Sequence, residues 1–232
     1  MSKTLDLIDF HAHILPGADH GSTDIECSKR QIELLSDVGI KRIVATPHFY
    51  PHKTTLKSFL SLREKSIRDI KQVLDVNSPE IYAAAEVLLM PGLDKMDGLE
   101  ELCINGTNVI LVELPVQQLD GGIEDALLNM RENGLVPVVA HIDRYEKEVR
   151  QRLVSLGLYC QINVSALCSL RRRMNIMPCV SDGAIYALGT DIHGTNEGFT
   201  ENYVKGCKRL KQELNPIMER SAELLVRAEP IK

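Results

Sequence analysis

Six of the seven histidines in this chain follow short apolar stretches that predict buried β-strands. They are His11, His13, His20, His48, His141 and His193. Imidazole is the commonest metal ligand in proteins, and the strands of an α/β barrel deliver side chains to one common mouth. The pattern therefore predicts a metal centre at the mouth of such a barrel.

Carboxylates occupy the same kind of position as the histidines. Glu86 and Glu113 follow predicted strands, and Asp191 precedes His193 by two residues. Residues i and i+2 of a strand face the same side, so a pair with this spacing can point at one ion. Mixed imidazole and carboxylate ligation suits Zn²⁺, Mn²⁺ or Fe. At least seven ligand-type residues exceed what one tetrahedral ion can use, which favours a cluster of two or three ions.

Apolar strand-like segments alternate along the chain with amphipathic helical segments. Strands are predicted at residues 5–10, 42–45, 81–85, 109–112, 136–140, 159–163 and 187–189, and helices at 25–38, 56–74, 123–133, 146–156 and 216–227. Thr23 and Glu26 have the spacing of a capping box for the first helix. Strands joined by helices favour a parallel sheet with right-handed crossovers, so the expected fold class is α/β.

Length and composition limit the classes of protein that this chain can represent. With 232 residues and 44% hydrophobic content, we expect a single domain over residues 1–232. The net charge of −5 and the pI near 5.8 disfavour nucleic acid and anionic membranes as main partners. Aromatic residues make up only 4% of the chain, which disfavours a stacking platform for bases or sugars.

Cysteine usage and the N-terminal residues bear on the cellular compartment. The six cysteines form no Cys-x-x-Cys pair and are expected to be reduced thiols. The first residues lack the charged and apolar regions of a signal peptide, and no later stretch is long and apolar enough to span a bilayer. We therefore expect a cytoplasmic protein.

Several of these residues also have ordinary structural explanations. His52 is expected to be a surface residue, and Glu113 alone could pair with a nearby lysine or arginine. The run Arg171-Arg172-Arg173 is more often a solvated helix face than an anion site, and is kept as a secondary candidate for binding an acidic substrate. The metal interpretation depends on the joint occurrence of ligand-type residues at six strand ends.

These segments resemble, in unbroken order, the successive motifs of the PHP (polymerase and histidinol phosphatase) superfamily. The matching segments are residues 8–17, 45–48, 86, 112–115, 140–145 and 190–193. The branch most similar to this chain is that of the manganese-dependent protein tyrosine phosphatases encoded with bacterial capsule and exopolysaccharide genes. The resemblance implies a distorted seven-stranded (β/α) TIM-like barrel and a trinuclear metal centre. It also implies hydrolysis of phosphotyrosine on a partner tyrosine kinase that controls polysaccharide export.

The resemblance also implies how the ligands divide among the ions. One ion would take His11, His13, Glu86 and Asp191, a second Glu86, Glu113 and His141, and a third His48, His193 and either Asp19 or His20. The family's usual Asp-Asp-Gly is here Asp19-His20-Gly21, so His20 stands where a carboxylate ligand is expected.

The substrate side of the site departs from the family pattern as well. Arg144 matches an arginine expected to clamp phosphate, but a second arginine expected shortly after His193 is missing. Residues 194–203 contain no basic side chain. Either Arg144 holds the phosphate alone, or a residue such as Lys53 or Arg173 substitutes for the missing one.

The implied reaction is attack on the phosphorus by a hydroxide that bridges the ions, without a covalent intermediate. The candidate catalytic residues are Arg144, Asp191 and His141, and either Asp191 or Asp143 would protonate the leaving oxygen. Tyrosinate needs little such help because its ordinary pKa is about 10. Two other functions stay open: another PHP phosphoesterase, such as a histidinol phosphatase, and a weakly catalytic module that binds a partner protein. No sequence feature predicts the oligomeric state.

Overall fold

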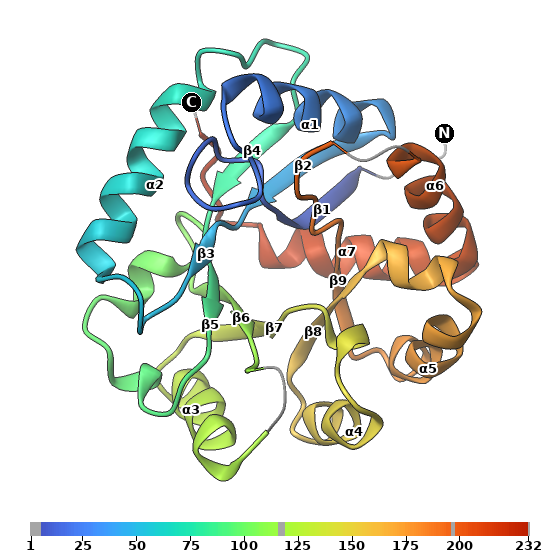
Figure 1. The fold of residues 1–232 in the computed structure, drawn as a ribbon. Coiled ribbons are helices and arrows are strands. Elements are labelled where there is room, and N and C mark those ends of the chain that lie inside the picture. The colour runs from blue at the N-terminus through green and yellow to red at the C-terminus, as the bar shows by residue number, and fades with distance from the viewer. Residues whose placement is uncertain (1–5, 116–118, 196–197, 232) are drawn as a thin grey trace.

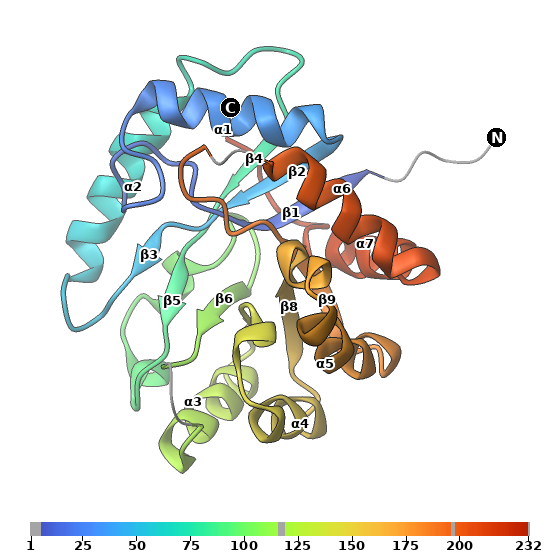
Figure 2. The same ribbon diagram turned by 45° about the vertical axis from the view of Figure 1, so that its right-hand side comes forward.

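The computed structural model describes residues 6–115, 119–195 and 198–231. Strands lie at the centre of the molecule and helices surround them (Figure 1), and the turned view shows the same arrangement (Figure 2). Every strand pairing in the described chain is parallel. The predicted α/β class with parallel sheets is therefore confirmed.

The described residues contain nine strands in two sheets. They are β1 (Leu7–Ala12), β2 (Ile40–Ala45), β3 (His48–Phe49), β4 (Glu80–Ala83), β5 (Glu86–Leu88), β6 (Val109–Glu113), β7 (Val136–Val139), β8 (Tyr159–Asn163) and β9 (Ile185–Gly189). One sheet has the order β1-β2-β4 and the other the order β3-β5-β6-β7-β8-β9.

The predicted count of seven strands in a closed barrel is not confirmed. Strands β2 and β4, which correspond to the predicted second and third strands, are each followed, after two residues, by a short further strand that pairs in the other sheet. The interruptions fall at residues 46–47 and 84–85. Pro47 has no amide hydrogen to donate to a neighbouring strand, so the ladder breaks there. Among the described residues, strand pairing therefore leaves two sheets rather than one closed barrel.

The segment that follows the last strand, β9, nevertheless pairs with the end of the first strand, β1. Ala12 forms an isolated parallel bridge with Ile192, which follows β9. The amide of Asp191 donates to the carbonyl of His11 at 2.8 Å, and the amide of His13 donates to the carbonyl of Ile192 at 3.3 Å. The last strand thus delivers residues 191–193 to the side of residues 11–13.

In the part of the chain that the structure describes, seven α-helices connect and cover the strands. They are α1 (Ile25–Asp37), α2 (Leu56–Ile70), α3 (Gly121–Glu132), α4 (Lys147–Ser155), α5 (Leu170–Ser181), α6 (Phe199–Leu210) and α7 (Leu214–Leu224). Short 3₁₀ helices lie at Leu93–Lys95, Leu99–Leu102, Ile142–Arg144, Val164–Cys168 and Lys211–Glu213. Helices α5 and α6 were not predicted from the sequence. The cap of α1 is Asp24, whose carboxylate accepts from the Cys27 amide at 2.8 Å, and not the predicted Thr23.

The core consists of apolar strand residues packed against the inner faces of the helices. Strand β6 illustrates why these segments form parallel strands, because its first four residues, Val-Ile-Leu-Val, are all buried. A continuous apolar run of this kind belongs to a strand covered on both faces. All six cysteines are free thiols, and no helix among the described residues is long and apolar enough to cross a membrane.

Candidate metal centre

Two imidazoles at the end of β1 form the first part of the site. His11 and His13 are fully buried, and their Nε2 atoms lie 3.0 Å apart. They point to the same side because they are two residues apart in an extended segment. The Nδ1 atoms point elsewhere: that of His11 lies 3.3 Å from Gln161 Oε1, and that of His13 lies 2.6 Å from Asp19 Oδ2. Both Nε2 atoms are therefore directed at a common centre.

Glu86, the first residue of β5, lies at the middle of the cluster with 1% exposure. Its Oε2 atom is 3.2 Å from the Nε2 atom of His11 and 3.3 Å from that of His13. The same oxygen lies 2.8 Å from His48 Nδ1, while Oε1 lies 2.9 Å from His141 Nε2. One carboxylate thus contacts histidines from three parts of the chain.

The ends of β6 and β7 provide the next two side chains. Glu113 closes β6, and its Oε1 atom lies 3.4 Å from His141 Nε2. His141 follows β7 in a left-handed conformation with φ 32°, which is uncommon for a residue other than glycine. Such a conformation persists only where surrounding contacts hold it, so the bend at His141 marks a constrained position in the site.

The segment after β9 completes the cluster. Asp191 Oδ1 lies 3.7 Å from the Nε2 atom of His11 and 3.5 Å from that of His13. Its other oxygen accepts hydrogen bonds from Arg144 and from Asn163, the latter at 3.0 Å. The His193 ring stacks on that of His13 with 4.1 Å between the ring centroids.

The sequence predicted that one residue of the pair Asp19 and His20 binds metal, and the structure places these two side chains in different parts of the site. Asp19 accepts from the ring of His13 and also from the His48 amide at 3.0 Å, so its carboxylate holds two other site residues. His20 is exposed, and its ring stacks on that of His48 with 5.0 Å between the centroids and lies tilted against that of His193 at 4.6 Å. His20 therefore lies over the cluster, at its solvent side.

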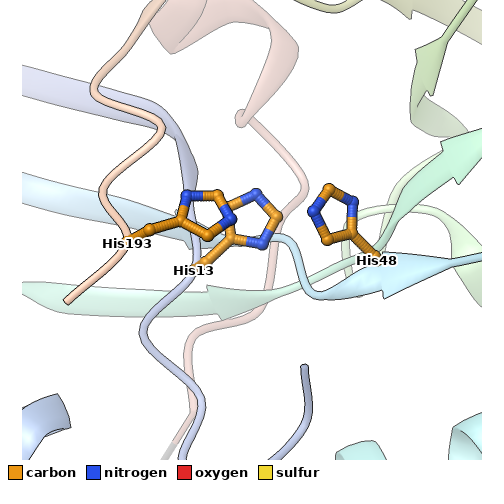
Figure 3. A group of neighbouring side chains, drawn as sticks. All are labelled: His13, His48 and His193. Atoms are coloured by element: carbon orange, nitrogen blue, oxygen red, sulfur yellow. The ribbon is translucent and has the colours of Figure 1, made fainter. Parts of the chain in front are cut away.

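Three sets of potential ligand atoms lie close enough together to hold a cation. They are His13, His48 and His193; His11, His13 and Asp191; and His48, Glu86 and Glu113, with atoms in each set within 4.8 Å of one another. Figure 3 shows the first set, with the three rings brought together from separate segments of the chain.

The bonding of this cluster also fits a bound cation. His48 Nδ1, Glu86 Oε2 and His193 Nε2 are buried atoms without a hydrogen-bond partner. His48 Nδ1 and Glu86 Oε2 lie 2.8 Å apart, but their geometry is not that of a hydrogen bond. Buried polar atoms are almost always satisfied, and coordination would satisfy these. The residues therefore suit divalent metal ions.

The electrostatics of the cluster favour positive charge. Burial lowers the pKa of His13, but the hydrogen bond to Asp19 and the negative charges of Asp19 and Glu86 outweigh this effect and raise it to about 10. Burial likewise disfavours charge on Glu86, yet the surrounding histidines hold its pKa well below the ordinary value. The carboxylates thus stay ionised in a buried space, which is the environment that a cation requires.

Several residues that support the cluster were not predicted from the sequence. Asp9 accepts from the Thr190 amide at 2.9 Å and from its hydroxyl at 2.5 Å, which ties β1 to the segment containing Asp191. Gln161 and Asn163 on β8 contact the ligands directly. The sequence does contain an indication for Gln161 and Asn163, because both are polar and lie two residues apart in an otherwise apolar strand.

The candidates for a second phosphate-binding cation lie outside the cluster. Lys53 lies over the Tyr50 ring at 4.4 Å, and that ring stacks on His48. Arg173 lies on α5, and none of its contacts connects it to the metal ligands. Part of the segment that lacks basic residues, at 196–197, lies outside the described residues.

Comparison with known proteins agrees with this geometry. The model of the family described as "Capsular polysaccharide synthesis, CpsB/CapC" matches residues 7–215. The chain belongs to this family. Our prediction of a branch associated with bacterial capsule synthesis is thereby confirmed.

Individual relatives extend the comparison. The tyrosine-protein phosphatase CpsB of Streptococcus pneumoniae is 30% identical over 169 residues, which cover 68% of this chain and 67% of the relative. The tyrosine-protein phosphatase YwqE of Bacillus subtilis is 26% identical over 240 residues, covering 97% and 93%. A crystal structure from a study of YwqE and CpsB, described as metal-dependent tyrosine phosphatases, superposes with a TM-score of 0.78 at 21% identity over 96% of each chain. That structure shares the fold of this CpsB/CapC family member.

Proposed function

We propose that this protein is a metal-dependent phosphatase that hydrolyses phosphotyrosine on a protein substrate. The observation that carries the proposal is the convergence of histidines and carboxylates on Glu86, with Arg144 at the edge of the cluster bound to Asp191. Membership of the CpsB/CapC family and the names of the relatives support the same activity.

We propose that two or three ions occupy the cluster and that Mn²⁺ is the preferred one. Nine residues would hold them: His11, His13, His20, His48, Glu86, Glu113, His141, Asp191 and His193. The three sets of converging atoms support more than one ion, and the mixed donor set suits Mn²⁺ among other metals. Such ions supply a nucleophilic water at neutral pH and neutralise charge on phosphate.

Arg144, Asp191 and His141 are the proposed catalytic residues. The Arg144 side chain is 49% exposed, while the oxygen of Asp191 that it contacts points away from the histidines. A guanidinium has five donors in a planar fork, so Arg144 can keep this contact and still bind phosphate oxygens. Arg144 would thus orient the phosphate beside the ligands that His141 and Asp191 provide.

A pocket beside Arg144 supports an aromatic leaving group. It has a volume of about 240 Å³ and is lined in part by Asp191, Val164, Phe199 and Tyr203. A mixed apolar and aromatic wall next to the phosphate-binding arginine suits the ring of a phosphotyrosine better than a short alkyl chain. A larger pocket of about 710 Å³, near Tyr159 and Tyr186, lies at the opposite ends of the strands and is lined by none of the proposed catalytic residues.

The proposed substrate is a phosphotyrosine protein, and specifically a bacterial tyrosine kinase that regulates capsule or exopolysaccharide synthesis. Turnover of a phosphotyrosine peptide and of histidinol phosphate, measured side by side, tests this proposal. A clear preference for histidinol phosphate would assign the protein to another phosphoesterase activity. Metal binding without turnover of either compound would instead indicate a partner-binding module.

We extend the proposal to the architecture and location of the chain. Residues 1–232 would form one PHP-type domain, in which β2 with β3 and β4 with β5 act as two interrupted strands of a distorted seven-stranded barrel. The cytoplasm is the proposed compartment, and the free thiols are consistent with it.

Metal content provides a direct test of the cluster. Protein purified without chelator is expected to carry about two or three divalent ions per chain, because the ligands exceed the coordination sphere of one ion. Elemental analysis measures the content, and less than one ion per chain would contradict the cluster. Chelation should abolish phosphatase activity, and Mn²⁺ should restore it best. Restoration by Mg²⁺ with no effect of Mn²⁺ would contradict the imidazole-rich assignment.

The His20→Asp variant tests the unusual residue of the proposed third site. Because His20 is exposed and its ring lies against those of His48 and His193, an aspartate there meets no burial penalty and adds a carboxylate beside two imidazoles. We expect phosphatase activity with Mn²⁺ that equals or exceeds that of the wild type. A large loss of both bound metal and activity would show that the site depends on the imidazole of His20.

A further inference from the structure

Gln161 is a fully buried amide that lies inside the ligand cluster without being a ligand type. It belongs to β8, between the strands that end near His141 and Asp191 (Figure 1). A buried amide is costly unless its oxygen and nitrogen are both hydrogen-bonded. The partners of Gln161 therefore show which groups it holds.

The oxygen of Gln161 faces two ligand residues from different strands. Oε1 accepts from the His141 amide at 2.6 Å and lies 3.3 Å from His11 Nδ1. A backbone amide can only donate, so the side-chain oxygen, and not the NH₂ group, must face His141. The orientation of the Gln161 amide is thus decided by the backbone.

This orientation decides the tautomer of His11. Because Oε1 can only accept, His11 must carry its hydrogen on Nδ1 when the ring is neutral. Its Nε2 atom is then the one with a free lone pair, and this atom faces His13, Glu86 and Asp191. The amide thus prepares His11 for coordination through Nε2.

The nitrogen of Gln161 extends the contact to a third ligand. Nε2 donates to Asn163 Oδ1 at 3.0 Å, and Asn163 Nδ2 donates to Asp191 Oδ2 at 3.0 Å. The space around the amide is also tight, since a Cβ on Gly189 would lie 2.4 Å from Gln161 Nε2 and 2.6 Å from His11 Cβ. The side chain is therefore held in one position by its neighbours.

We propose that Gln161 is a positioning residue that sets the His11 tautomer and holds the left-handed backbone of His141, without binding metal itself. This inference rests on the proposed metal-dependent function. Hydrogen-bond partners of metal ligands fix ring orientation and commonly change metal affinity by about 10–100-fold when removed.

Two substitutions separate this role from general packing. Gln161→Glu keeps an acceptor for the His11 ring and the His141 amide, whereas Gln161→Met fills a similar volume without any acceptor. Each purified apo-protein is titrated with Mn²⁺ while the electron paramagnetic resonance signal of free Mn²⁺ is recorded. We expect Gln161→Met to bind Mn²⁺ about 10–100-fold more weakly than wild type, and Gln161→Glu to stay within a few-fold of it.

A second readout addresses the tautomer, which a purely structural role would leave unchanged. Nitrogen NMR of histidine-labelled apo-protein, at a pH at which the His11 ring is neutral, should show hydrogen on Nδ1 of His11 in the wild type and in Gln161→Glu, and a mixed state in Gln161→Met. Wild-type affinity and an unchanged tautomer in Gln161→Met would overturn the proposal. Equally weakened Mn²⁺ binding in both variants would also overturn it. If Gln161→Met does not fold, a 10-fold loss of Mn²⁺ affinity in Gln161→Glu would overturn the proposal by itself.

The same proteins separate this inference from the proposed function. If wild type hydrolyses a phosphotyrosine peptide and Gln161→Met binds Mn²⁺ as well as wild type, the function stands and the positioning role fails. If wild type binds Mn²⁺ but hydrolyses no phosphotyrosine peptide, the function fails. The role of Gln161 is then still judged from the difference in metal affinity between the two variants.

Discussion

Replacing Glu86 with glutamine is expected to remove bound metal and lower kcat/KM on an aryl phosphate by at least about 1000-fold, or about 4 kcal/mol. The reason is its central position, since its two carboxylate oxygens contact four imidazoles, those of His11, His13, His48 and His141. Glutamine keeps the shape of the side chain but removes its negative charge and replaces one oxygen with a donor. Elemental analysis and phosphatase kinetics on the same preparation provide the measurement.

The surface residue Glu124 offers a matched control for this experiment. Glu124 lies on α3, and its carboxylate pairs with Arg152 at the surface. Glu124→Gln makes the same chemical change away from the site, so metal content and kinetics should stay at wild-type values. If Glu86→Gln retained two or more ions and most of its activity, Glu86 would not be the centre of the metal cluster.

The Arg144→Ala variant is expected to lower kcat/KM on an aryl phosphate by about 2–4 kcal/mol, or about 30–1000-fold, the range for losing a charged contact with the transition state. Arg144 is the proposed phosphate clamp, and the described part of residues 194–203 supplies no second basic residue. Metal content should stay unchanged, because the oxygen of Asp191 that faces His11 and His13 is not the one bound by Arg144. Arg144→Lys should recover only part of the loss, since an ammonium lacks the planar fork.

Steady-state kinetics and elemental analysis of Arg144→Ala check both parts of this expectation. Arg152→Ala serves as the control, because it removes a half-exposed arginine that is paired with a carboxylate away from the metal ligands. Near-normal turnover in Arg144→Ala would mean that the ions or another cation hold the phosphate. Loss of metal in Arg144→Ala would instead make the arginine a support for Asp191, and its assignment as a phosphate clamp would fail.

The features that the sequence predicted correctly are those that depend on local patterns. Apolar runs such as the one in β6 indicate buried strands because each residue must be covered on both faces of a parallel sheet. Ligand-type residues directly after such runs meet because parallel strands end at the same edge. The spacing of His11 and His13 places both rings on one side of an extended segment, and their Nε2 atoms do lie together.

The sequence resemblance identified the family, but it did not predict the interruptions of the strands. The breaks at residues 46–47 and 84–85 appear only once each half of the segment pairs with a different neighbour. Helix α5 was missed because its local helical signal is weak. Helix α5 carries three consecutive arginines directly after its first residue, Leu170, where positive charge opposes the helix dipole, and it contains Pro178. Packing against the rest of the chain must therefore stabilise it.

The sequence by itself determined which residue types gather at the strand ends and to which family the chain belongs, because both depend on residue identity and order. Only the tertiary structure decided what each side chain does there. Asp19 holds His13 rather than standing free, His20 lies over the cluster, and Gln161 connects two ligand residues from other strands. These contacts join residues up to 150 positions apart, and no local spacing encodes such a distance. They arise because burial leaves each polar group only the partners that the fold brings within reach.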